Sequence, residues 1–300
     1  MTMRAAPRRC PVCGTLPRAT LRLSRNARLL QCRSCLLGWW DWPAFDPRRF
    51  YNRDYFQSTE APKGYDNYAS MTHAAGITAR ARLSRIERLL GQSDGQRRLL
   101  EIGCGPGEFL DVAADADWKV RGVEVSPYAA GEAQRRGHDV SCAAAEAFSC
   151  SGSTYDCVAL WDVIEHVRQP ATLLAHCANS LSPGGVLALS TGDVTSLCAR
   201  LSGASWHLFN LPEHLFFFSP RSLELMLSRA GLRVTRVCRE INWVPASYVF
   251  ERICKTLGVA RPAARWEHWA IPATLLDVVG VYALRRSGER PSCRAAPGGI

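Results

Sequence analysis

The chain has 300 residues, a formal net charge of +10 and a hydrophobic content of 47%. This length accommodates one α/β domain of about 200 residues together with a small additional module. No N-terminal stretch has the apolar core of a signal peptide, and Asp277 interrupts the apolar run at 271–284. We therefore expect a cytoplasmic protein with neither a secretion signal nor a membrane span.

The positive charge is concentrated near the N-terminus. Residues 1–40 contain eight arginines and no acidic residue, whereas the remaining sequence is close to balanced. Such a basic segment suits contacts with phosphates, so nucleic-acid binding is an alternative to a small-molecule partner. The balanced charge of the main domain favours the small molecule.

Four cysteines in residues 1–37 form two C-x-x-C pairs. Cys10 and Cys13 make the first pair, and 18 residues separate Cys13 from the second pair, Cys32 and Cys35. This spacing is typical of a four-cysteine zinc ribbon, in which two tight turns complete a tetrahedral sulfur site. Four protein ligands leave no open coordination position, so we expect one structural zinc ion.

Residues 38–69 form an aromatic connector that contains prolines and lacks helix or strand periodicity. We expect the connector to pack the ribbon onto the main domain; alternatively, Tyr65 and Tyr68 extend over a ligand site as a lid. Residues 70–90 have the apolar spacing of an amphipathic helix. The arginines of this helix, which we expect to face solvent, are Arg80, Arg82, Arg85 and Arg88.

Strand-like and helical segments alternate from residue 97 onward. The expected strands span residues 97–102, 118–124, 138–142, 155–161, 185–190, 232–241 and 277–286. Alternation of this kind predicts a parallel sheet with helices on both faces. We therefore expect one α/β domain over residues 70–286, followed by a flexible tail at 287–300 that is rich in proline, glycine and arginine.

The sequence LEIGCGPGEFL joins the first of these strands to a helix. It places Glu101 before three glycines, Gly103, Gly105 and Gly107. Glycine lets the backbone turn sharply and approach a ligand closely, and the helix that follows presents free backbone N–H groups. The G-x-G-x-G spacing differs from the G-x-G-x-x-G fingerprint of nicotinamide enzymes, so we do not favour that class.

The next strand ends at Glu124, 17 residues after Gly107. A carboxylate at this place can accept hydrogen bonds from two ribose hydroxyls. A buried strand and helix start follow at 155–167, and a Pro-Gly-Gly turn leads into another strand at 181–191. Over about residues 70–285, this order of motifs resembles the class I S-adenosylmethionine-dependent methyltransferases.

The resemblance implies a seven-stranded, Rossmann-like sheet whose last strand runs antiparallel between its neighbours, and S-adenosylmethionine as cofactor. It places Glu101 near the methionine ammonium, Glu124 at the ribose, and the backbone around Ala145 and Glu146 at the adenine. Trp161 contacts the adenosine, faces the sulfonium or is a core aromatic. The expected cofactor-binding residues are Glu101, Gly103, Gly105, Gly107, Glu124, Val125, Ala145, Glu146 and Trp161.

Three histidines are candidates for the catalytic base. His166 closes a sequence, Asp162-Val-Ile-Glu165-His166, that resembles the E-x-x-E-H magnesium site of ubiquinone-pathway O-methyltransferases; a Glu-His pair here also occurs without metal. His207 and His214 lie in an aromatic segment at 205–220, after the expected fifth strand. Its W-x-x-x-x-x-P-x-H-x-x-x-F-S pattern resembles the methyltransferase type 23 group. His214 is either a base or a structural residue.

Two further histidines, His73 and His138, have no neighbours that suggest a function, and we expect both at the surface.

The function expected from the resemblance is transfer of a methyl group (EC 2.1.1.-) to a small-molecule or lipid- or sugar-linked biosynthetic intermediate, with oxygen favoured as the acceptor atom. A zinc-ribbon RNA base methyltransferase is the alternative enzyme, although the strand at 155–161 is not followed by an N-P-P-Y-type motif. A non-catalytic, ribbon-based binding protein is the other alternative. The intact glycines and Glu124 argue against it.

Overall fold

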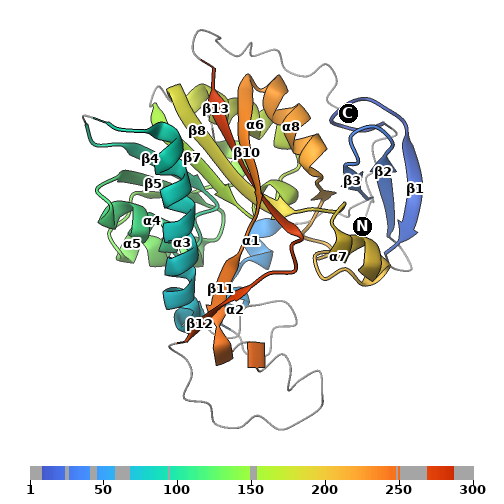
Figure 1. The fold of residues 1–300 in the computed structure, drawn as a ribbon. Helices are drawn as coiled ribbons and strands as arrows, with labels where there is room; N and C mark the ends of the chain where they lie inside the picture. Colours follow the sequence, from blue (N-terminus) through green and yellow to red (C-terminus); the bar gives the residue numbers. More distant parts are fainter. Residues whose placement is uncertain are drawn as a thin grey trace.

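The computed structural model describes residues 9–23, 27–40, 46–57, 68–93, 95–148, 154–247, 249–250 and 269–286. A large twisted sheet forms the centre of the molecule, and a small sheet that contains the N-terminal strands lies to one side (Figure 1). The predicted lid residue Tyr65, the side chain of Tyr68 and the predicted tail at 287–300 lie outside the described residues.

The large sheet has seven strands in the order β10-β13-β8-β7-β4-β5-β6. Its strands are β4 (Arg98–Ile102), β5 (Lys119–Glu124), β6 (Val140–Cys142), β7 (Tyr155–Trp161), β8 (Leu181–Gly192), β10 (Leu232–Arg239) and β13 (Val278–Arg285). β4 to β8 pair in parallel, whereas β13 runs antiparallel to both β8 and β10. This order confirms the predicted Rossmann-like α/β fold, including its antiparallel last strand.

Helices cover both faces of this sheet, which is why its central strands are continuous apolar runs. The principal helices are α3 (Tyr68–Leu90), α4 (Glu108–Asp115), α5 (Pro127–Arg135), α6 (Pro170–Ser180) and α8 (Pro220–Arg229). Leu99 of β4 packs in the cluster of α3, α4 and α5, and the next residue, Leu100, packs in the cluster of α6 and α8. Successive side chains of a strand point to opposite faces, so one strand contributes to both cores.

Local signals place the helix starts. Ser126 accepts a hydrogen bond from the backbone N–H of Ala129 at the start of α5, and Pro127 occupies the first turn. Ser219 and Ser222 form a capping box at the start of α8, again with a proline in the first turn. Both caps satisfy backbone N–H groups that the helix itself leaves without partners.

The prediction that the arginines of α3 face solvent is wrong for two of the four. Arg82 donates from Nε to Oε2 of Glu240 over 3.3 Å, and Arg85 donates from Nη1 to Oε1 of the same carboxylate over 3.0 Å. The Glu240 side chain is 1% exposed, and a buried carboxylate requires opposite charge. Arg80 and Arg88 are exposed, as expected.

The small sheet joins the N-terminal module to the main domain. β1 (Pro17–Arg22), β2 (Arg28–Cys32) and β3 (Gly38–Trp39) are followed in space by β9 (Phe216–Phe217). β3 pairs antiparallel with β9, and a Cβ added to Gly38 would lie 3.2 Å from Cβ of Phe217. Trp39 is fully buried. The core of the N-terminal module is thus continuous with the core on the α6 and α8 face of the large sheet.

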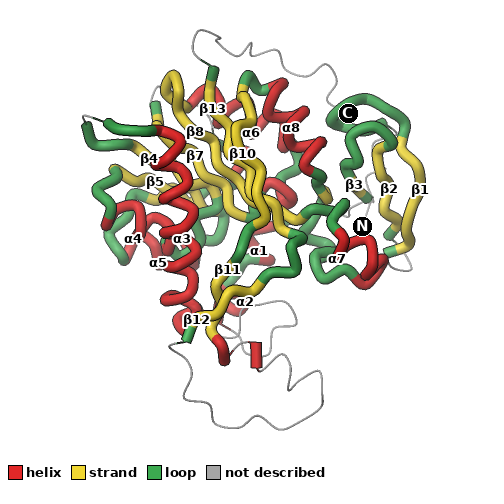
Figure 2. The backbone as a smooth tube through the Cα atoms, in the orientation of Figure 1, coloured by secondary structure: helices red, strands yellow, loops and turns green. Residues whose placement is uncertain are grey.

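Several short elements were not predicted. Two helices, α1 (Pro47–Phe50) and α2 (Arg53–Gln57), lie in the aromatic connector, and the Asp46 side chain caps the first of them. α7 (Leu197–Ser202) follows β8. β11 (Asn242–Pro245) and β12 (Ala270–Ala273) form a separate antiparallel pair, and β11 packs against α3 (Figure 2). Within the described ranges, every helix is too short or too polar to cross a membrane.

Candidate functional site

A cavity of about 500 Å³ opens at the carboxyl ends of β4, β5 and β7. In open parallel sheets of this kind, ligands bind in the crevice at this edge. The predicted cofactor residues that line it are Glu101, Gly103, Gly105, Glu124, Val125, Ala145, Glu146 and Trp161. Of the three candidate bases, only His166 lines the cavity.

The three glycines of the loop differ in position: Gly103 and Gly105 line the cavity, whereas Gly107 lies between two helices. Gly103 (φ +72°) and Gly105 (φ +53°) both adopt the left-handed region, and a Cβ on Gly103 would lie 2.4 Å from Cγ2 of Val163. Gly107 does not line the cavity. It begins α4, where an added Cβ would lie 3.1 Å from the His138 ring and 3.2 Å from Ala133, so it allows α4 to approach α5.

The prediction that His138 is a surface residue is wrong. Its side chain is 8% exposed, and its Nε2 lies 2.6 Å from Oδ1 of Asp111 on α4. The carboxylate partner lies 27 residues away in the sequence and gave no local signal.

Backbone hydrogen bonds hold Glu124 in place at the end of β5. Its Oε2 accepts from the N–H of Gly105 over 2.9 Å, and its Oε1 accepts from the N–H of Ser126 over 2.8 Å. The residue is 6% exposed, and burial raises the pKa of the carboxyl while these bonds oppose the shift. Each carboxylate oxygen has two acceptor positions, so Glu124 can accept further hydrogen bonds from hydroxyl donors.

Glu101 is a buried carboxyl whose Oε2 has no hydrogen-bond partner among the described residues. Burial raises its pKa well above the ordinary value; the nearby charge of Glu108 adds to the shift, and that of Arg82 opposes it. A buried polar atom left unpaired costs about 1–3 kcal/mol. A ligand that donates hydrogen bonds, such as an ammonium group, would therefore fit here.

Trp161 lines the cavity beside a cation of the protein itself. The guanidinium of Arg82 stacks over its ring at 4.4 Å, and Arg82 also lines the cavity. Nη2 of Arg82 donates to Oδ1 of Asn242 and to Oγ of Ser190, each over 3.4 Å. These bonds fix a positive charge at the cavity wall, beside an aromatic face that attracts cations.

Asp162, the residue after β7, turns the chain toward the candidate base. It has φ +55°, an uncommon conformation for any residue other than glycine. Ser190 of β8 stabilises this turn, because its Oγ donates to Oδ1 of Asp162 over 3.0 Å. Such strained positions occur preferentially at functional sites.

His166 sits at the cavity wall as a neutral imidazole. Its Nδ1 lies 3.0 Å from the carbonyl oxygen of Glu213 and 3.0 Å from the hydroxyl of Tyr51. A carbonyl only accepts hydrogen bonds, so Nδ1 carries the proton and Nε2 remains an acceptor. Burial lowers the pKa of His166, which keeps the ring uncharged near neutral pH.

Glu165 and His214 lie behind this imidazole. The rings of His166 and His214 meet edge to face with centroids 4.6 Å apart. The ligand atoms of Glu165, His166 and His214 lie within 4.8 Å of one another. Burial, and secondarily the charge of Asp162, raises the pKa of Glu165 to about 8. The Asp162 carboxylate is instead bonded to Ser190, so the grouping differs from the Asp162-Glu165-His166 set of the sequence motif.

The structure places His207 apart from the other two histidines. Its Nε2 lies 2.7 Å from Oδ2 of Asp277, its side chain is 46% exposed, and it does not line the cavity.

Sequence reasoning missed the residues that complete the cavity wall. Tyr51, Tyr55 and Phe56 come from the connector, and Trp243 and Val244 come from β11. The many aromatic residues of the connector were a sequence signal for Tyr51, Tyr55 and Phe56. No such signal marked Trp243 and Val244, because β11 pairs with a strand that begins 28 residues after the start of β11. Burial raises the pKa of Tyr55 to about 12 and also raises that of Tyr51, so both remain neutral phenols.

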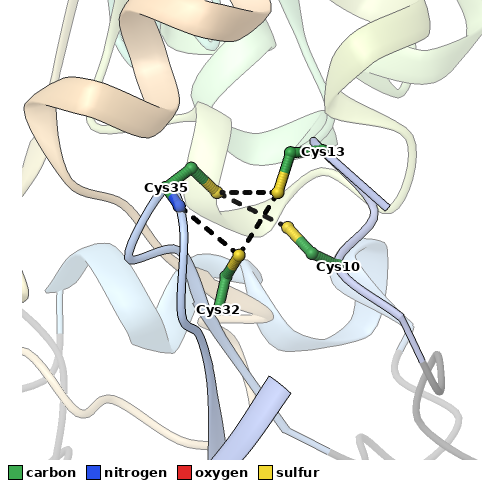
Figure 3. A group of neighbouring side chains, drawn as sticks. All are labelled: Cys10, Cys13, Cys32 and Cys35. Carbon is green, nitrogen blue, oxygen red and sulfur yellow. Dashed lines mark hydrogen bonds between the residues drawn. The ribbon is translucent and has the colours of Figure 1, made fainter. Parts of the chain in front are cut away.

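The four cysteines of the N-terminal module converge (Figure 3). Sγ of Cys10 lies 3.5 Å from that of Cys35, and Sγ of Cys13 lies 3.3 Å and 3.7 Å from those of Cys32 and Cys35. A tetrahedral zinc site with Zn–S of about 2.3 Å separates its sulfurs by about 3.8 Å. Backbone N–H groups of Ser34 and Cys35 donate to Sγ of Cys32. The donor set therefore fits a zinc ion.

Comparison with known proteins agrees with this geometry. Residues 74–237 match a family model described as a methyltransferase domain. A solved structure, the magnesium protoporphyrin IX methyltransferase from Synechocystis with bound S-adenosylhomocysteine, shares the fold at 17% identity and a TM-score of 0.50, covering 78% of this chain and 97% of that one. The fold and the matched residues define a class I S-adenosylmethionine-dependent methyltransferase domain.

The chain belongs to this methyltransferase-domain family, whose model covers more than half of it. One curated relative is the ubiquinone biosynthesis O-methyltransferase of Parvibaculum lavamentivorans, which is 32% identical over 150 residues, or 46% of this chain and 59% of the relative. Another is the enzyme of the same name from Cereibacter sphaeroides, which is 32% identical over 162 residues, or 49% of this chain and 66% of that relative. The chain spans less than two thirds of the length of either relative.

Proposed function

We propose that the protein uses S-adenosylmethionine to methylate a hydroxyl group of a small, largely apolar biosynthetic intermediate. The observation that carries this proposal is one shared cavity. The carboxylates of Glu101 and Glu124 line it together with the neutral imidazole of His166. The O-methyltransferase names of the curated relatives support oxygen as the acceptor atom.

The residues of the cavity suit the cofactor group by group. The unpaired Oε2 of Glu101 would accept from the ammonium of the methionine part, and Arg82 would pair with its carboxylate. Glu124 would accept from the two ribose hydroxyls, and the backbone at Ala145 and Glu146, which also line the cavity, would hold the adenine. When bound, the cofactor supplies a methyl group on a positively charged sulfonium.

His166 would take the proton from the acceptor hydroxyl. The carbonyl of Glu213 fixes the ring and its tautomer, so Nε2 is the atom that accepts the proton. The Glu165 carboxyl lies within 4.8 Å of this imidazole. Tyr51, Tyr55, Phe56 and Trp243 would exclude water and face an apolar or aromatic acceptor.

We also propose that the four-cysteine module binds one structural zinc ion. The sulfur separations and the closed set of four ligands support this assignment, since structural zinc sites are tetrahedral and have no open position.

The proposal is tested by an assay with methyl-labelled S-adenosylmethionine and a panel of phenolic, carboxylic and amine acceptors. We expect transfer to phenols and little to amines. A protein that transfers only to amines, or that transfers to RNA but not to small molecules, would contradict the acceptor class.

A further inference from the structure

Three metal-ligating side chains from distant segments meet outside the cavity. Cys198 lies on α7, His207 follows the 3-10 turn Gly203–Ser205, and Asp277 immediately precedes β13. One ligand atom from each lies within 4.8 Å of the others, and none of the three lines the cavity of about 500 Å³. The proposed methyl transfer uses none of these residues.

The carboxylate of this cluster is fixed before any ligand arrives. Asp277 is 2% exposed, and its Oδ2 accepts from Nε1 of Trp206 over 2.8 Å and lies 2.7 Å from Nε2 of His207. Its backbone carbonyl accepts from the N–H of Asp193 over 2.7 Å. Carboxylates that bind metals are commonly held in this way by an outer hydrogen bond, here that of Trp206.

The side chains nearer the surface supply the remaining donors. Cys198 is partly buried, and its sulfur contacts Oγ of Ser202 at 4.0 Å and also interacts with the carboxylate of Asp277. His207 is about half exposed, so water can reach the cluster on its side. Thiolate, imidazole and carboxylate are the three ligand types of zinc, and ligand atoms of a tetrahedral zinc site lie roughly 3.3–3.8 Å apart. Small side-chain rotations would bring the donors to that spacing.

We propose that Cys198, His207 and Asp277 bind a second zinc ion, separate from the four-cysteine module, with water as the fourth ligand. Binding requires loss of the thiol proton of Cys198 to solvent and a lone pair on the His207 imidazole. The ion would connect α7 and the segment at 203–207 to the start of β13.

The pair formed by His138 and Asp111 provides a matched control within the same chain. Its Nε2–Oδ1 distance of 2.6 Å resembles the contact between His207 and Asp277. No third metal ligand joins the His138 pair within the part of the chain that the structure describes. The control therefore shares the histidine–carboxylate contact of the proposed site and lacks its third ligand, the cysteine.

The test is equilibrium dialysis of the full chain against free zinc, followed by elemental analysis, for the wild type and the Cys198→Ser, His207→Ala and His138→Ala variants. We expect the first two variants to hold about one zinc ion less than the wild type and His138→Ala to hold the same. Melting curves check that each variant is folded. We expect little change for Cys198→Ser and His207→Ala, because these side chains are partly exposed, and a lower melting temperature for His138→Ala, because its side chain is buried. Equal zinc content in all four proteins would overturn the proposal.

A second measurement identifies the sulfur ligand. Dialysis against cobalt should produce a thiolate-to-cobalt absorption band in the wild type beyond that of the Cys198→Ser variant. A band of equal intensity in both proteins would place the metal elsewhere and contradict the assignment.

Discussion

The indole nitrogen of Trp40 donates a 2.8 Å hydrogen bond to the backbone carbonyl of His214. Trp40 follows β3 of the N-terminal module, and His214 precedes β9, the strand with which β3 pairs. In the same region, Oγ of Ser219 donates to the carbonyl of Cys35 over 2.6 Å. The four-cysteine module thus holds the segment that contacts His166, so its integrity and the geometry of the proposed base are linked.

Replacing Trp40 by Phe tests this link. The variant keeps an aromatic ring but leaves the carbonyl of His214 without its donor, at a cost of about 1–3 kcal/mol. We expect a lower melting temperature and lower turnover, with the affinity for S-adenosylmethionine unchanged. Trp269→Phe is the control, because Trp269 is 73% exposed. Turnover and melting that match the wild type would show that the contact does not position the site.

The proposed ribbon zinc predicts a specific metal loss. A Cys10→Ser/Cys32→Ser double variant should contain about one zinc ion less than the wild type and melt at a lower temperature, because the module has a small core without metal. The exposed Cys142 gives the control, Cys142→Ser, which should change neither. Unchanged zinc content in the double variant would exclude the site.

The raised pKa of Glu165 predicts a pH dependence of stability. Its carboxyl has a pKa of about 8 in the folded state and an ordinary value near 4.5 when unfolded, so the folded protein binds the extra proton between these values. The free energy of unfolding contributed by Glu165 therefore falls as the pH rises from about 4.5 to 8. Glu165→Gln should flatten this part of the profile, measured by denaturant titrations; a slope equal to that of the wild type would contradict the assignment.

His166 and His214 differ in their position relative to the cavity, because His166 lines it and His214 does not. His166→Ala should lower turnover roughly 10²-fold or more, the usual contribution of a general base, while cofactor affinity stays nearly constant. His214→Ala should have a smaller effect, because His214 supports the His166 ring from behind. Full turnover in His166→Ala with a large loss in His214→Ala would reverse these roles.

The sheet could be predicted from the sequence because its parallel strands are buried apolar runs with glycine and proline turns between them. The carboxylates at the cavity were predictable for a similar reason, since Glu101 and Glu124 stand at strand ends. Contacts between distant segments were not predictable. Glu240, whose carboxylate accepts a hydrogen bond from Arg82, lies 158 residues after it. The strand Gly38–Trp39 pairs with Phe216–Phe217, which is also far away in the sequence.

Calorimetric binding of S-adenosylmethionine tests the central claim most directly. The wild type should bind one molecule per chain, and Glu124→Ala should weaken binding about tenfold to hundredfold, since a hydrogen bond to a charged group contributes about 1.5–3 kcal/mol. Glu224→Ala, at an exposed position of α8, should bind like the wild type. Absence of binding in the wild type, or equal affinity in Glu124→Ala, would contradict the account.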